Sequence, residues 1–161
     1  MTVPVWSELR FATRAWLVAP AVELGLAWAG LHRTLRWIER TAPVHGPAPE
    51  GRGSVDAARG ARLVDRAYRL HLVRGQCLPR ALVQYWLHRR DGTAVRFILG
   101  VRKASRTTDA EPQGDRRETI EAHAWVEPLE DEAAAPTAAG GEGFEVLLVR
   151  EADPSRRGAA T

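Results

Sequence analysis

The segment from Gly75 to Arg90 constrains this chain more than any other, because it places the protein's only cysteine at the start of an amphipathic helix. Pro79 suits a first helical turn, where its missing N–H costs no hydrogen bond and its φ is already near the helical value. Apolar residues then recur at helical spacing. Cys77 is therefore expected where free backbone N–H groups and the helix dipole favour a negative charge. A lone cysteine can also be a small buried hydrophobe, so a reactive thiol needs further support.

His123 supplies that support, because it offers a base for the thiol. It lies in the segment Glu118–Pro128, which reads as a β-strand. Period-2 alternation puts His123, Trp125 and Glu127 on one face of this strand. Trp125 could wall a substrate groove or fill the core, and the sequence leaves both readings open. Glu127 shares the face with His123, but four residues along a strand span more than ~12 Å, too far for direct contact.

The order of elements predicts an α+β fold, with N-terminal helices and a Cys-bearing central helix packed on a small antiparallel sheet. The N-terminal part reads as two helices separated at Pro20, forming a hairpin. A Pro- and Gly-rich linker follows, and then a third helix precedes the central one. Beyond Gly92 the hydrophobic period changes to two, and the strands are expected to form a meander. The predicted helices are Trp6–Leu17, Ala21–Arg40, Val55–Val73 and Cys77–Asp91, and the predicted strands are Ala94–Lys103, Glu118–Pro128 and Phe144–Val149.

We divide the chain into a helical hairpin and linker (1–50), a core domain (51–150) and a flexible tail (151–161). The stretch from Ala15 to Leu31 is almost free of charge, but Pro20 and Glu23 interrupt it and it is short for a membrane span. A buried hairpin is the expectation, and a helix on a membrane surface remains the alternative. Neither a signal peptide nor a phosphate-binding loop is recognisable.

Composition narrows the function classes. One cysteine excludes an internal disulfide, and no Cys/His spacing fits zinc, so we expect no metal or cofactor and a reduced, cytoplasmic location. The net charge of +3 comes without a basic stripe interleaved with aromatic residues. Nucleic-acid binding is therefore not expected.

Four blocks together resemble the transglutaminase-like leader peptidases of lasso peptide biosynthesis. They are Cys-Leu-Pro-Arg-Ala-Leu (77–82), Leu-His-Arg-Arg-Asp-Gly (87–92), Phe-Ile-Leu-Gly-Val (97–101) and Ala-His-Ala-Trp-Val-Glu (122–127). The resemblance covers roughly residues 55–149 and implies a transglutaminase-like or papain-like core. It also implies a cysteine protease that removes the leader from a ribosomally made precursor peptide before macrocyclisation.

The resemblance assigns roles to residues. Cys77 would be the nucleophile, and His123 the base and then the acid for the leaving amine. The oxyanion hole would use the Cys77 backbone N–H, with Gln76 as a guess for the second donor. The family's third residue is an Asp after the His, and this chain has no clean match to it. Asp131 is the first choice by residue type, with Glu130 and Glu132 as alternates.

The resemblance also implies partners, namely the precursor peptide, a separate leader-binding recognition protein and a lasso cyclase. Two other functions stay open. The chain could be another transglutaminase-like acyl-transfer enzyme, or a non-catalytic peptide-binding scaffold of the same fold.

Overall fold

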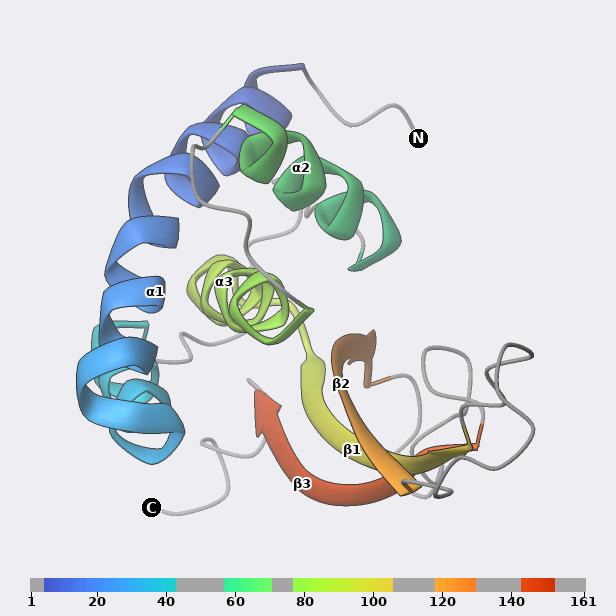
Figure 1. Cartoon of the computed structure of the whole chain (residues 1–161). Coiled ribbons are helices and arrows are strands. Elements are labelled where there is room, and N and C mark those ends of the chain that lie inside the picture. Colours follow the sequence, from blue (N-terminus) through green and yellow to red (C-terminus); the bar gives the residue numbers. More distant parts are fainter. Residues whose placement is uncertain (1–4, 43–56, 71–76, 106–117, 130–142, 153–161) are drawn as a thin grey trace, which may run out of the picture.

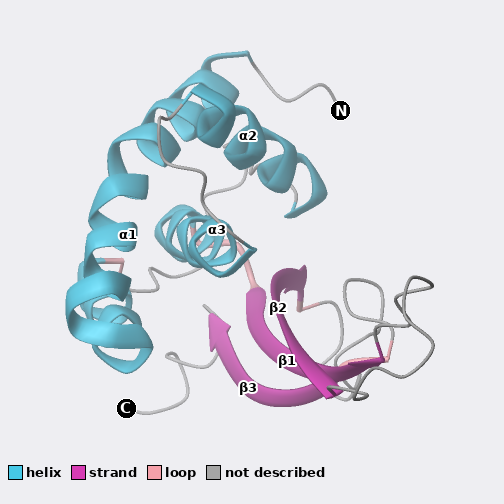
Figure 2. Ribbon diagram, viewed as in Figure 1, coloured by secondary structure: helices cyan, strands magenta, loops and turns pink. Residues whose placement is uncertain are grey.

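The structure is a computed structural model, and it describes residues 5–42, 57–70, 77–105, 118–129 and 143–152. The helices are α1 (Val5–Thr41), α2 (Ala57–Leu70) and α3 (Cys77–Asp91). The strands are β1 (Val95–Ser105), β2 (Glu118–Pro128) and β3 (Glu145–Ala152). Figure 1 shows α3 at the centre, with α1 and α2 around it on one side and the three strands on the other. The helices gather on one side of the molecule and the antiparallel sheet on the other, so the predicted α+β class is confirmed (Figure 2).

The break in the N-terminal helix lies at Gly30, so the prediction of a break at Pro20 is wrong. Pro20 lies inside α1 on its exposed side, where water can satisfy the carbonyl that a proline leaves without a donor. Gly30 has non-helical angles, φ 74° and ψ 173°, in the left-handed half of the map that favours glycine. The Thr34 hydroxyl then donates to the Gly30 carbonyl at 2.9 Å and holds the next turn.

The central helix α3 is enclosed along most of its length. Pro79 and every residue from Ala81 to Arg89 are buried, including polar side chains that an amphipathic helix would expose. His88 is one of these, and its ring packs against Phe11 of α1 with centroids 5.4 Å apart. On the α2 side, a Cβ at Gly60 would come within 2.6 Å of the His88 Nε2, so glycine permits the close approach of the two helices.

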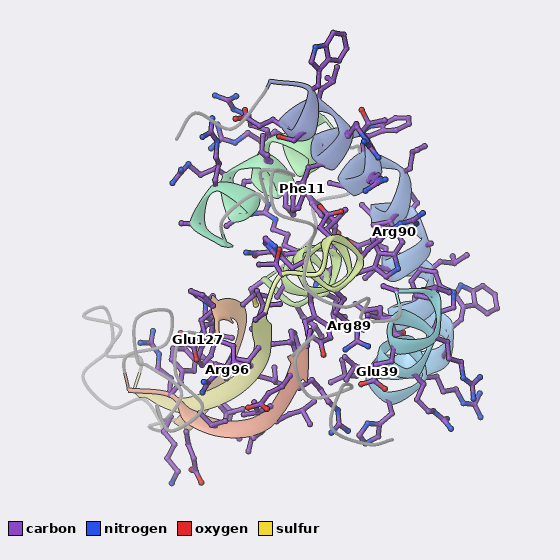
Figure 3. The ribbon with its side chains drawn as sticks, turned by 180° about the vertical axis from the view of Figure 1, so that it is seen from behind. Phe11, Glu39, Arg89, Arg90, Arg96 and Glu127 are labelled. Carbon is purple, nitrogen blue, oxygen red and sulfur yellow. The ribbon has the colours of Figure 1, made fainter. Side chains whose placement is uncertain are left out.

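Arg89 joins three elements from within this buried helix. Its Nε donates to the Ala42 carbonyl at the end of α1 at 3.1 Å, and a terminal nitrogen donates to the Tyr85 hydroxyl at 3.2 Å. The Tyr85 hydroxyl in turn donates to the Glu151 carbonyl on β3 at 3.2 Å. Figure 3 shows Arg89 between the helices and the sheet. One buried guanidinium thus connects α1, α3 and β3.

The strand order is β2-β1-β3, so the prediction of a meander is wrong. Strand β3 pairs antiparallel with β1, not with β2. The reason lies in β1, where Val95, Phe97 and Ile98 are all fully buried. Successive side chains of a strand point to opposite faces, so the first residues of β1 are covered on both faces, and the strand takes the central position with a partner at each edge.

Replacing Arg89 by methionine should lower the free energy of unfolding by about 2–4 kcal/mol, because the buried Ala42 carbonyl loses its charged donor. The neighbouring Arg90 is the matched control. It is exposed and stacks 5.2 Å from the Trp86 ring, so Arg90→Met should cost no more than about 1 kcal/mol. Urea unfolding of both variants measures the difference. Equal costs would show that Arg89 does not join the elements.

Asp91 at the end of α3 gives a pH-dependent prediction. Burial raises the pKa of its carboxyl, and the opposing effect of Arg14, whose guanidinium lies 3.1 Å away, does not cancel it. A folded-state pKa above the unfolded one gives a stability contribution that is complete below the ordinary value of 3.8 and is lost as pH rises through the folded pKa. Asp91→Asn should therefore be at least as stable as wild type at pH 7, with the advantage shrinking toward pH ~4. Urea unfolding at both pH values checks this, and a clear loss of stability at pH 7 would contradict it.

Candidate active site

Cys77 is the first residue of α3 and is half-buried with a free thiol. Its Sγ lies 3.8 Å from the Ala122 carbonyl oxygen of β2, at the distance of a weak S–H···O hydrogen bond. Ala122 immediately precedes His123. The packing of α3 against β2 therefore brings Cys77 to the backbone of β2 beside His123. Ala124 lies in the core with residues of α3, and alternation along the strand points the His123 side chain to the opposite face.

His123 lies in an aromatic cluster formed with Trp125 and Phe144. Its ring stacks on Trp125, with centroids 5.8 Å apart and planes 20° apart, and the Phe144 ring lies 5.6 Å away. Trp125 and Phe144 meet edge to face at 6.4 Å. His123 and Trp125 are half-buried, so each ring keeps part of its surface open to solvent.

Gly100 of β1 provides the space for this cluster. It pairs with His123 on one side and with Val146 on the other, at a register shift in the β1–β3 pairing. A Cβ at Gly100 would meet the Phe144 Cβ at 3.0 Å and the Trp125 ring at 3.3 Å. Only a residue without a side chain lets both aromatic rings approach β1 this closely.

Arg102 and Glu121 extend the cluster with a pair of opposite charges. The Arg102 guanidinium lies 4.7 Å from the Phe144 ring centroid and forms an ion pair of 2.8 Å with Glu121. Neither Phe144 nor Arg102 was predicted from the sequence to join the cluster around His123. Their approach depends on β3 pairing with β1, and no local spacing in the sequence reveals that pairing.

Trp125 takes the predicted place on the His123 side of the strand, and its indole Nε1 is buried without a hydrogen-bond partner in the described part of the chain. Glu127 lies further along β2, directly opposite Arg96 in the register (Figure 3). Both side chains are buried. Glu127 thus faces an opposite charge on the neighbouring strand, four residues along β2 from His123.

The remaining predicted site residues lie outside the described residues. These are Gln76, the guess for the oxyanion hole, and the three candidate acids Glu130, Asp131 and Glu132. Within the described ranges, no group of three His, Cys, Asp or Glu side chains could hold a metal ion.

A protein-family comparison places this arrangement in a class. The model of the transglutaminase-like superfamily matches residues 16–149, which is most of the chain. The protein therefore belongs to the transglutaminase-like superfamily, whose enzymes typically use a Cys-His-Asp site. This membership indicates an activity of the cysteine protease or acyltransferase type. Neither a curated protein nor a solved structure matches the chain.

Gly100→Ala should displace the aromatic cluster and lower the free energy of unfolding by about 1–3 kcal/mol, because the new methyl overlaps Phe144 and Trp125. Lys103→Ala, at an exposed position of the same strand, is the control and should change little. The indole N–H resonance of Trp125, assigned with Trp125→Phe, should shift in the first variant and not in the second. An unchanged resonance with unchanged stability would show that the cluster does not rest on Gly100.

Proposed function

We propose that this protein is a cysteine peptidase that cleaves the leader from a ribosomally made lasso peptide precursor before macrocyclisation. The proposal depends on the superfamily membership and on one observation above the others. The thiol of the only cysteine lies at the N-terminus of a buried helix, against the strand residue that precedes His123. The four sequence blocks that resemble lasso leader peptidases favour this substrate over other members of the superfamily.

In the proposed reaction the Cys77 thiolate attacks the scissile carbonyl and forms a tetrahedral intermediate. His123 takes the thiol proton and then gives it to the leaving amine of the core peptide as the C–N bond breaks. Water, deprotonated by His123, hydrolyses the resulting thioester and releases the leader. The first backbone N–H groups of α3 have no partner within the helix, and they favour negative charge on the sulfur and on the oxyanion. The step requires the His123 ring to come within hydrogen-bond reach of the Cys77 Sγ, and catalytic hydrogen bonds often tighten only when substrate binds.

Three further roles belong to this proposal. Gln76 adds a second oxyanion donor, and Asp131 orients the His123 ring, with Glu130 and Glu132 as alternates. Trp125 offers the peptide an apolar surface beside the base. A leader-binding protein presents the precursor in the cytoplasm, and a cyclase takes the released core.

Cys77→Ala and His123→Ala should each lower the rate of precursor cleavage by about 10³-fold or more, because each removes a group that acts in the covalent step. The purified protein, its leader-binding partner and a synthetic precursor are mixed, and mass spectrometry follows the products. His32→Ala is the matched control, because His32 is exposed on α1 away from the cluster, and it should cleave as wild type does. Full cleavage by Cys77→Ala would refute the peptidase and leave a peptide-binding scaffold.

The same assay separates hydrolysis from acyl transfer. A leader ending in a free carboxylate supports the peptidase, whereas a leader joined to an added amine acceptor at a higher yield would indicate a transferase. Asp131→Asn, Glu130→Gln and Glu132→Gln, run in parallel, should single out Asp131 by a loss of kcat at unchanged KM.

A further inference from the structure

The N-terminal helix presents a long apolar surface to solvent. Trp28 is 84% exposed, Trp6 75%, and Leu17 and Leu24 62% each, although soluble proteins usually bury side chains of this size. Apart from the adjacent Trp16 and Leu17, successive members of the set are three, four or seven residues apart, so they share one side of α1 before the break at Gly30. We call this set the outer face, and it consists of Trp6, Leu9, Trp16, Leu17, Leu24 and Trp28.

The opposite side of α1 is fixed to the protein. Phe11, Ala15, Val18, Ala19 and Val22 are buried there in the common core. Among the described residues, α1 is the one helix that is long and apolar enough to cross a membrane. Crossing would require this inner side to leave the core, whereas the outer face can meet a membrane with the fold intact. The outer face therefore suits a helix that lies on a bilayer surface.

The charges of α1 are distributed to suit an anionic surface. Its acidic side chains face the protein, where Glu8 pairs with Arg59, Glu39 lies 3.9 Å from Arg150, and Glu23 is near enough to help raise the pKa of Tyr68, after burial itself. The fully exposed charged side chains of α1 are all arginines. They are Arg10, Arg33, Arg36 and Arg40.

We propose that the outer face of α1 binds the surface of a membrane that carries anionic lipids. Tryptophan prefers the membrane–water interface, and four of the six tryptophans of the chain are exposed on α1. Exposed arginines add attraction to anionic headgroups; Arg10 lies within the segment of the outer face, and the other three follow the break at Gly30. The exposed charged side chains of α1 thus carry one sign, which complements an anionic lipid surface. The inference is independent of the proposed peptidase activity.

Flotation of the full-length protein with lipid vesicles tests the proposal. The chain should float with phosphatidylcholine vesicles that contain about one-third phosphatidylglycerol, and much less with pure phosphatidylcholine. Raising the salt should weaken binding. Leu24→Ser combined with Trp28→Ser, and Arg33→Gln combined with Arg36→Gln, should each lower the partition coefficient by about tenfold or more.

Matched controls change the same chemistry elsewhere. Leu147→Ser removes an exposed apolar side chain from β3, and Arg66→Gln with Arg69→Gln removes two exposed charges from α2. Both should bind as wild type does, and circular dichroism verifies that every variant is folded. Absence of flotation with anionic vesicles would overturn the proposal. So would a wild-type dimer that the Leu24/Trp28 variant converts to a monomer, because a second copy would then cover the outer face.

Discussion

The fold depends on the burial of α3. A helix enclosed by α1, α2 and the sheet gains apolar contacts on every side, but its polar residues then need partners within the protein. Arg89 meets that need by bonding the Ala42 carbonyl and the Tyr85 hydroxyl, which ties the end of α1 to β3. The same enclosure fixes the position of the first residue of the helix. Cys77 lies against β2 because the buried residues of α3 that follow it are held in place by close packing.

The sheet contributes the second half of the site through its central strand. β1 is buried on both faces at its start and pairs with β2 and β3, so it sets the distance between the His123 strand and the start of β3. Gly100, at the middle of β1, leaves room for Trp125 and Phe144. The imidazole thus packs against Trp125 of its own strand and Phe144, the residue before β3.

Local patterns predicted the elements well, because helix period, strand period and turn residues act over short distances. The α3 and β2 boundaries match the expectation, and the α+β class followed from them. The predictions were wrong where contacts between residues distant in the sequence determine the structure. Pro20 reads as a helix break, yet exposure lets the helix continue through it, while Gly30 took the break. The prediction of a meander was wrong because the burial of both faces at the start of β1 cannot be recognised from the sequence of any one segment. Asp131 and its alternates stay a prediction based on residue type.

In the proposed function, Cys77 is the nucleophile of a leader peptidase. Because the chain has a single cysteine, iodoacetamide can modify only this thiol, and the intact mass reports the fraction modified. Precursor cleavage should fall in proportion to that fraction and vanish when alkylation is complete. Cleavage at the wild-type rate by quantitatively alkylated protein would contradict the claim.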